Sequence, residues 1–355
     1  MNESSTDKLQ WSTRKYRDGD EEQIRKLRGI TLSGAKDDRW WKWFYKNNPA
    51  GPSLIWIAEV DNEIIGHAAH VPIRMKIGNQ EVIGALGVDS MTHPDYQHQG
   101  ILKKLQEKIA ESSVEHGLYI SVGTCLSHIM TIYKKLQIIE ICQQHLLMKV
   151  TSLGKLLKRR FGIPRFLGNA LGYIWELITT RNSSTEDNII DINQIFTFEK
   201  SINEFWRKAS VQKQIMVVRD MEYLNWRYFE KPGEDYKIFV AKKEVDIMGY
   251  MVLKLGKIDP TRGLIIDLLT LPDDNIVIET LICKAIAYFK ENGILIISCF
   301  MLPDTQYYPI LKKLGFIRRN SDLHFDIDIY NQSVSKEFVT NPQNWYFVRG
   351  DTDAD

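Results

Sequence analysis

The chain has 355 residues, which is enough for two domains with large hydrophobic cores. Its 46 basic and 45 acidic residues nearly cancel, which argues against a nucleic-acid partner and against a strongly acidic one. No apolar run reaches the roughly 18 residues that a membrane-spanning helix needs, and the polar residues 1–8 do not resemble a signal peptide. We therefore expect a cytoplasmic protein with no integral membrane segment.

The first half of the chain predicts a helical region followed by alternating strands and helices. Trp43 and Tyr45 lie in the helical region. The expected elements that follow are strands 54–60 and 64–70 around a tight turn, strand 82–92, helix 101–113, strand 118–125 and a helix that carries Tyr133. Early antiparallel strands followed by a β-α-β-α run predict a mixed sheet covered by helices.

The segment 91–102, which joins a strand to the next helix, is the most informative part of the chain. A polar loop follows Pro94 and ends at Gly100, where the helix begins. Backbone N–H groups of such a loop, with the unpaired ones at the helix start, converge on a point that the helix dipole also makes positive. The pattern predicts binding of a phosphate or pyrophosphate, which Gly100 allows to approach the backbone. An ordinary polar turn is the alternative.

Parts of the sequence occur twice. Trp43, Tyr45 and Pro49 recur 183 residues later as Trp, Tyr and Pro, and the segment 134–136 recurs 178 residues later as the same Lys-Lys-Leu. A difference of five residues in a hairpin would account for the two offsets. We infer two copies of one fold, and therefore an α/β protein with two tandem mixed-sheet domains.

The second copy repeats the order of the first. Its expected elements are strands 236–242, 247–255 and 264–271, helix 276–291, strand 294–301 and a helix at 311–316. The segment between the copies is basic and then apolar, and we expect a helical connector packed on one or both domains; a membrane-surface helix is the alternative. The expected boundaries are 1–150 for the first domain, 151–188 for the connector and 189–355 for the second domain.

The residues that bind metals in other proteins show no metal-type spacing here. His67 and His70 fall on one predicted strand, where they face opposite sides. The four cysteines form no CxxC pair, and we expect free thiols in a reducing compartment at Cys125, Cys142, Cys283 and Cys299. We expect no metal site.

In this loop, in the order of its expected strands and helices and in its internal repeat, the chain resembles a tandem member of the GNAT acyl-CoA N-acyltransferase superfamily. The resemblance covers nearly the whole chain. The cofactor loop of that family, Gln/Arg-x-x-Gly-x-Gly/Ala, is matched by Gln97 and Gly100, whereas Leu102 departs from the usual small residue. A Leu also occurs at this position in the enhanced-intracellular-survival type of two-domain acetyltransferase, which the chain resembles. The resemblance implies two tandem GNAT-like α/β sandwich domains and acetyl-CoA as co-substrate.

The resemblance also implies roles for single residues. The pantetheine arm and the acetyl group would pair with the backbone of Ser90, Met91 and Thr92. The pyrophosphate would be held by Gln97, His98, Gln99, Gly100, Ile101 and Leu102. Tyr133 stands where the family keeps its general acid, although Gln137 and Ile138 replace the Gly and the aromatic residue usual at that helix end.

Transfer of an acyl group to an amine needs a proton donor for the leaving thiolate and a base for the ammonium. A phenol with a pKa near ~10 is protonated at pH 7, so Tyr133 suits the first task; packing of its ring on the sheet is the alternative. Asp89, on the strand that enters the loop, is a candidate base, and a structural role for it is equally open. His93, Asp351, Asp353 and water are further candidates for the base, although an ordinary frayed acidic tail is the favoured interpretation of the last residues.

The aromatic cluster at 40–45 borders the expected acceptor site. Trp43 and Tyr45 are repeated in the second copy, which indicates a packing role for them. Trp40 and Trp41 therefore remain as candidates for contact with the acceptor.

The second copy departs from the family at the cofactor loop. It reads Leu-Pro-Asp-Asp-Asn at 271–275, with no Gly and with two carboxylates, Asp273 and Asp274, that would repel a pyrophosphate. We expect that this copy kept the fold and lost the cofactor; two active sites is the alternative.

Together these features predict a single-site N-acetyltransferase that moves an acetyl group from acetyl-CoA directly to a small-molecule primary amine, with amino sugars as one acceptor class. An aminoacyl-tRNA-dependent ligase of the two-domain type and a non-catalytic acyl-CoA-binding scaffold are the alternatives. The sequence does not identify the amine.

Overall fold

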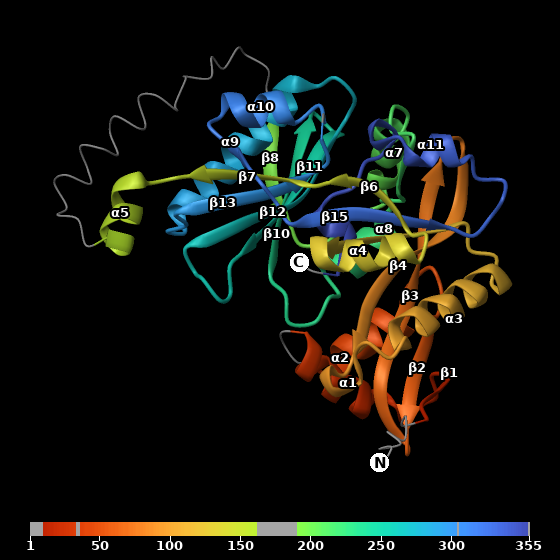
Figure 1. The fold of residues 1–355 in the computed structure, drawn as a ribbon. Helices are drawn as coiled ribbons and strands as arrows, with labels where there is room; N and C mark the ends of the chain where they lie inside the picture. Colours follow the sequence, from red (N-terminus) through yellow and green to blue (C-terminus); the bar gives the residue numbers. More distant parts are fainter. Residues whose placement is uncertain (1–9, 33–35, 162–189, 304, 354–355) are drawn as a thin grey trace, which may run out of the picture.

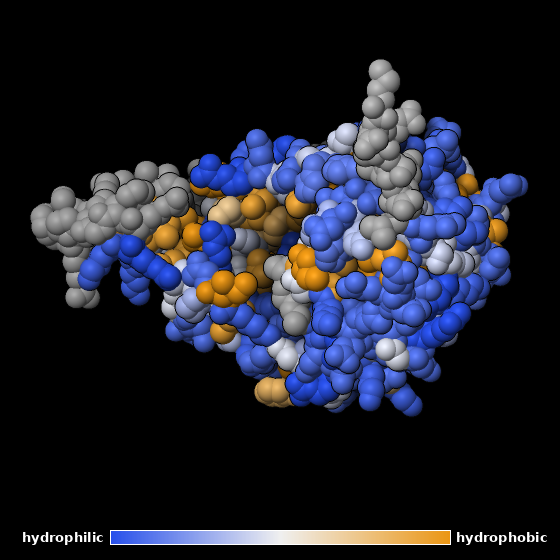
Figure 2. All heavy atoms as spheres, turned by 60° about the horizontal axis from the view of Figure 1, so that its bottom comes forward, coloured by the Kyte–Doolittle hydropathy of each residue, from blue (hydrophilic) through white to orange (hydrophobic). Residues whose placement is uncertain are grey.

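The structure is a computed structural model that describes residues 10–32, 36–161, 190–303 and 305–353. These residues form two mixed sheets with helices packed on them, so the expected α/β fold class is confirmed (Figure 1). Figure 2 shows a mostly hydrophilic surface on which hydrophobic residues gather around a hollow. No helix in the described ranges has the length and apolar character to cross a bilayer.

The first sheet contains the elements predicted for the first half of the chain. Its strand order is β1 (Ser12–Lys15), β2 (Leu54–Val60), β3 (Glu63–Ile77), β4 (Gln80–Thr92), β5 (Ile120–Leu126), β15 (Leu323–Ile329) and β6 (Ile139–Gln143), and β9 (Ile215–Val217) also pairs with β3. The helical elements are α1 (Glu21–Thr31), α2 (Asp38–Trp41), the π-helix η1 (Lys42–Lys46), the 3₁₀ helix η2 (Pro94–Tyr96), α3 (Ile101–Glu115) and α4 (Ser127–Lys135).

The second sheet repeats this arrangement. Its strand order is β8 (Asp191–Ile195), β10 (Tyr236–Lys243), β11 (Asp246–Leu255), β12 (Arg262–Thr270), β13 (Ile296–Met301), β7 (His145–Val150) and β14 (Ile317–Arg319). The accompanying helices are α7 (Ser201–Ala209), α8 (Met221–Tyr228), α9 (Asn275–Glu291), α10 (Tyr308–Lys313), α11 (Lys336–Thr340) and the 3₁₀ helices η3 (Pro342–Asn344) and η4 (Arg349–Asp351). Position by position, the two sheets have the same topology.

The two halves exchange one strand each. β15, from the second half, lies between β5 and β6, where Phe325 pairs with Thr124 on one side and Cys142 on the other. β7, from the first half, occupies the same place between β13 and β14. The exchanged strands begin at His145 and Leu323, which is the 178-residue offset of the sequence repeat. Each sheet is therefore completed by the other half of the chain (Figure 1).

The repeated tryptophans contact each other across the two halves. The indole N–H of Trp43 donates to the carbonyl oxygen of Trp226 (2.8 Å), and that of Trp226 donates to the carbonyl oxygen of Trp43 (3.2 Å). The rings stack with centroids 4.9 Å apart. A reciprocal contact between equivalent residues is expected for two copies related by an approximate two-fold axis, and it confirms the packing role of Trp43.

Packing on both faces of the first sheet holds the predicted anion loop in place. On α3, Ile101, Leu105 and Ile109 recur every fourth residue, and all three are buried. On the other face, α1 buries Ile24 and Leu27 in the main core. The start of α3 is thereby fixed relative to the end of β4.

The predicted connector is described only in part. Its beginning forms the helix α5 (Leu153–Phe161), and residues 162–189 lie outside the described part of the chain. The division into 1–150, 151–188 and 189–355 remains a prediction, and the strand exchange means that residues 145–150 lie in the second sheet.

Candidate functional site

A wedge between β4 and β5 forms the centre of the site. The two strands are parallel and pair only at Ala85 with Ser121 and at Leu86 with Val122. β4 then continues to Thr92 and β5 to Leu126 without further pairing between them. The facing backbone edges, which include the predicted pantetheine-binding residues at 90–92, are therefore free of a strand partner and suited to an extended ligand.

The predicted anion loop lies at the open end of this wedge. Gln97, His98, Gln99 and Gly100 are exposed, and α3 begins directly after them with Ile101 buried and Leu102 half-buried. Gly100 precedes α3 with a φ of 84°, and no side chain caps this helix start. The first N–H groups of a helix have no intrahelical partner, so this end of α3 presents donors and a positive dipole to an anion.

In the equivalent loop of the second half, a side chain of the protein already bonds to the helix start. The side chain of Asp274 caps α9 by accepting the N–H of Val277 at 3.0 Å. A carboxylate of the protein thus occupies the place that a phosphate would take at α3.

A second feature blocks the same half. The C-terminal segment, residues 345–353, lies across β12 and β13. Val348 bridges to Met301, and the Tyr346 hydroxyl donates to the carbonyl oxygen of Leu268 (2.6 Å). Both observations favour a second copy without a cofactor.

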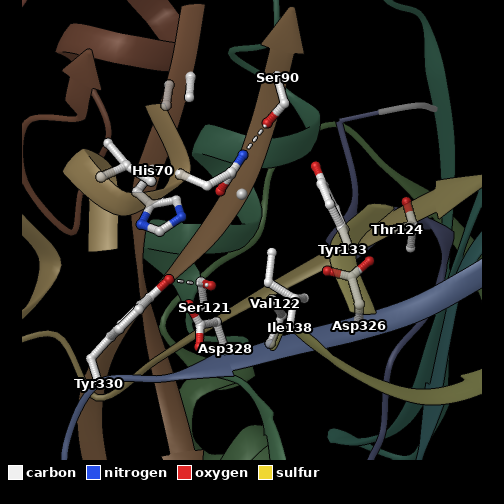
Figure 3. A pocket seen from close by; sticks show the side chains of 16 residues that line it. His70, Ser90, Ser121, Val122, Thr124, Tyr133, Ile138, Asp326, Asp328 and Tyr330 are labelled. Carbon is white, nitrogen blue, oxygen red and sulfur yellow. Dashed lines mark hydrogen bonds between the residues drawn. The ribbon is translucent and has the colours of Figure 1, made fainter. Parts of the chain in front are cut away.

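Tyr133 lies on α4 beside the wedge and lines a pocket with Ser90 of β4 (Figure 3). Burial raises the pKa of the Tyr133 phenol, and a hydrogen bond with Ser90 acts in the opposite direction. The amide nitrogen of Gln106 in turn donates to the Ser90 hydroxyl at 2.8 Å. The phenol is therefore protonated at neutral pH and lies close to Ser90 in the lining of the pocket, as suits a proton donor.

Asp89 lies on the other face of the sheet. Its φ of 47° coincides with a β-bulge between β3 and β4. The carboxylate receives Nε of Arg28 at 3.1 Å and the hydroxyl of Tyr45 at 2.8 Å, while its own carbonyl oxygen bonds to the ring of His67 (2.7 Å). Asp89 is thus firmly held by a cation and a phenol.

The same arrangement occurs in the second half. Asp267, which is 178 residues after Asp89, receives Nε of Arg219 at 3.2 Å and the hydroxyl of Tyr228 at 2.9 Å. Since this copy lacks the cofactor loop, the repeated carboxylate–arginine–tyrosine cluster favours a structural role for Asp89.

The C-terminal segment is held by side-chain contacts up to the last described residues, so the expectation of a frayed acidic tail is wrong for residues 351–353. Both oxygens of Asp351 accept from one nitrogen of Arg219 at 2.8 Å, and both side chains are buried. Arg227 donates to the carbonyl oxygens of Gly350 (2.7 Å) and Thr352. Two buried arginines of the second half therefore hold this segment in place.

This anchoring brings Asp353 to the site. Burial and the charge of Asp89 raise the pKa of Asp353 to about 6, with Arg28 acting against them. The charge of Asp353 also raises the pKa of Tyr133 and of Tyr45, so its carboxylate lies within electrostatic reach of both sides of the wedge. Asp353 was one of the sequence candidates for the base.

The remaining sequence candidates have structural roles. The ring nitrogen Nδ1 of His93 accepts the N–H of Asp95 at 3.3 Å and so caps η2. Trp40 and Trp41 are each 4% exposed and pack against neighbouring aromatic rings. Their burial argues against direct contact with an acceptor.

Three of the pocket-lining residues that were not predicted come from the second half of the chain. Asp326, Asp328 and Tyr330 come from β15 or directly follow it, and the strand exchange places them in one pocket with Tyr133 (Figure 3). No local pattern in the sequence signals this, because the three residues lie more than two hundred positions after the loop. Among the described residues, no group of three or more His, Cys, Asp or Glu side chains is placed to hold a metal ion.

Comparison with known proteins agrees with this geometry. Residues 12–137 match the family model of the acetyltransferase (GNAT) domain. No curated protein matches the sequence.

Solved structures share the fold of nearly the whole chain. A probable N-acyltransferase from Enterococcus faecalis V583 has a TM-score of 0.64 at 8% identity, covering 90% of this chain and 72% of that one. A GCN5-related N-acetyltransferase from Anabaena variabilis has a TM-score of 0.62 at 12% identity, covering 91% and 73%. N-myristoyltransferase of Saccharomyces cerevisiae, with bound myristoyl-CoA, has a TM-score of 0.60 at 10% identity, covering 91% and 82%.

Proposed function

We propose that this protein, an acyltransferase with a GNAT domain over residues 12–137, transfers an acetyl group from acetyl-CoA directly to a small-molecule primary amine at a single site. The observation that carries the proposal is the meeting of three features at one wedge. These are a free strand edge at 90–92, an anion-binding helix start at Gly100 and a protonated phenol at Tyr133. Amino sugars are the first acceptor class to screen.

Each feature has one task in the proposed reaction. The N–H groups of the loop 97–102 hold the pyrophosphate, and the backbone of Ser90, Met91 and Thr92 pairs with the pantetheine arm. A strand N–H near Met91 polarises the thioester carbonyl, as an oxyanion site does. The amine attacks the carbonyl carbon, the carbon–sulfur bond breaks, and Tyr133 gives its proton to the leaving thiolate.

We assign Asp353 as the base for the attacking ammonium. A carboxylate with a pKa of about 6 is ionised at neutral pH and accepts a proton more readily than an ordinary aspartate. Asp89, by contrast, is bonded to Arg28 and Tyr45 and repeats a cluster of the silent half. We therefore assign Asp89 to positioning Arg28 and to tuning the pKa of Asp353.

We place the reaction in the cytoplasm because all four cysteines of the chain are free thiols. The single-site part of the proposal is supported by Asp274, which caps α9, and by the C-terminal segment that covers β12 and β13.

The first experiment is calorimetric titration of the purified protein with acetyl-CoA, with free CoA as the comparison. We expect micromolar binding at one site per chain. Two sites would show that the second half is active. An absence of binding would contradict the proposal and favour the tRNA-dependent ligase or the scaffold.

A further inference from the structure

We propose that, beyond acetyl, the site selects short acyl groups that end in a hydrogen-bond donor, a hydroxyl or an amino group, which is held in the pocket beside Tyr133. The inference rests on the proposed function, because it assumes that the thioester of an acyl-CoA lies in the wedge between β4 and β5. Acetyl-CoA would fill the wedge and leave the pocket to water.

The shape of the pocket sets the length of the acyl group. Ser90 and Tyr133 line the end at the predicted thioester, and His70, Ser121 and Tyr330 line the other end (Figure 3). The cavity volume is about 40 Å³. A water-sized group needs at least ~10–15 Å³ by this measure, so about three heavy atoms fit beyond the carbonyl carbon. A fatty acyl chain does not.

The first hydrogen-bond acceptor in the pocket that lacks a donor in the described structure is Oδ2 of the Asp326 carboxyl group. This side chain is buried, and its Oδ2 atom has no hydrogen-bond partner among the described residues. A Cβ atom on Gly123 would lie 3.0 Å from Oδ1, so the glycine leaves room for the carboxyl. Burial raises the pKa of Asp326 to about 7, with a hydrogen bond from Cys125 acting against it. A buried polar atom without a partner is costly unless a ligand or water supplies one.

The second hydrogen-bond acceptor that lacks a described donor is Nε2 of His70. The Ser113 hydroxyl donates to the carbonyl oxygen of Ile109 (2.8 Å), so it accepts from Nδ1–H of His70 (2.7 Å). Burial lowers the pKa of His70 to about 3, which keeps the ring neutral. Nε2 is therefore an acceptor, and no described residue donates to it.

The charge of the lining selects the kind of substituent. Asp326 and Asp328 are acidic, and no Lys or Arg is among the described residues that line the pocket. The Ser121 and Tyr330 hydroxyls bond to each other at 2.8 Å. A terminal carboxylate, as in a succinyl group, would face two carboxyl groups without a cation, whereas a hydroxyl or amino group would donate to Asp326 or His70.

An isosteric series of thioesters tests this. Butyryl-, 3-hydroxypropionyl- and β-alanyl-CoA have three heavy atoms beyond the carbonyl and differ only in a terminal methyl, hydroxyl or ammonium group. Calorimetric titration of the full chain should give at least tenfold tighter binding for the hydroxyl or the ammonium compound than for butyryl-CoA. Comparison of 3-hydroxypropionyl-CoA with β-alanyl-CoA shows which hydrogen-bond donor the pocket prefers, the hydroxyl or the ammonium group. Succinyl- and myristoyl-CoA should bind more weakly than acetyl-CoA.

The variant Asp326→Leu, which keeps the branched shape of the side chain and removes the acceptor, should reduce that preference to threefold or less. Its affinity for free CoA should stay unchanged, which controls for the fold. Equal or tighter binding of butyryl-CoA by the unmodified protein, or an unchanged preference in Asp326→Leu, would overturn the inference and leave the proposed function intact. Failure of free CoA and of every thioester to bind would overturn both.

Discussion

Replacing Asp353 by Asn should lower activity and raise stability at the same time. The substitution keeps the shape of the side chain and removes a half-buried charge near Asp89. As the proposed base, Asp353 is needed in its ionised form for turnover. As a half-buried carboxylate whose pKa is raised by desolvation and by the charge of Asp89, it destabilises the fold in its ionised form. A residue with a purely structural role would not show both effects.

The size of the stability effect follows from the pKa. The pKa of Asp353 rises from 3.8 to about 6 in the folded protein. Each pKa unit corresponds to ~1.4 kcal/mol, so ionisation of Asp353 costs the folded state about 3 kcal/mol relative to the unfolded state. Below pH 4 both states are protonated and this cost is absent. Between pH 4 and 6 only the unfolded state ionises, so stability falls as the pH rises. Above pH 6 the full cost remains. Asp353→Asn should therefore raise the free energy of unfolding by up to ~3 kcal/mol at pH 7.5 and have little effect at pH 4.

Two measurements check this expectation. Urea unfolding at pH 7.5 and pH 4 gives the stability, with Asp246→Asn, an exposed carboxylate in the β10–β11 hairpin, as a matched control that should change nothing. The pH dependence of kcat/KM gives the catalytic role. The unmodified enzyme should lose activity about tenfold per pH unit below pH 6, and Asp353→Asn should lose about a hundredfold at pH 7.5 together with that slope. Unchanged kcat/KM in the variant would refute the assignment of the base, and a loss of stability at pH 7.5 would refute the electrostatic argument.

Three further substitutions test other parts of the structure. Gly100→Glu puts a carboxylate and a strained φ at the anion loop and should abolish CoA binding by calorimetry; retained binding would mean that the loop is misplaced. Tyr133→Phe should reduce kcat at least tenfold with little change in the Kd of acetyl-CoA, and an unchanged kcat would exclude the phenol as the proton donor. Arg219→Leu leaves Asp267 and Asp351 buried without their cation and should lower the free energy of unfolding in urea by about 3–5 kcal/mol; a change below 1 kcal/mol would contradict the ion-pair geometry.

Features that depend on local sequence were predicted well. The turn at Asp61 and Asn62 is present, with positive φ values of 48° and 66°, because these residue types tolerate that conformation. The loop that ends at Gly100 and the start of α3 were expected from a glycine followed by an amphipathic pattern, and both are in place. The repeat gave the common topology of the two halves, since equal patterns form equal elements.

The strand exchange was outside the reach of such reasoning. β7 and β15 have the same place in their repeats, so either strand fits either sheet by pattern alone. Which sheet a strand joins depends on the path of the chain after β6 and β14, a three-dimensional property. Asp326 was missed for this reason, because its importance comes from lying next to Tyr133 and Gly123 in the first sheet.

The C-terminal segment shows a different limit. Its acidic residues look like a solvated tail, and only the structure shows that Arg219 and Arg227 are buried and need carboxylate or carbonyl partners. Satisfying these two arginines fixes Asp351 and Thr352, and thereby brings Asp353 beside Asp89. The requirement of the second half for buried ion pairs thus determines the position of the proposed base of the first half.

The second half, which we propose to lack a cofactor, is therefore more than a support. It contributes Asp326 to one face of the first sheet through an exchanged strand and Asp353 to the other through the C-terminal segment. The same segment covers β12 and β13, so the contribution to the first site and the closure of the second have one structural cause. A copy whose own wedge was open could not hold this segment in the same way. Loss of the cofactor loop around Asp274 is what we expect once that wedge is occupied by the protein itself.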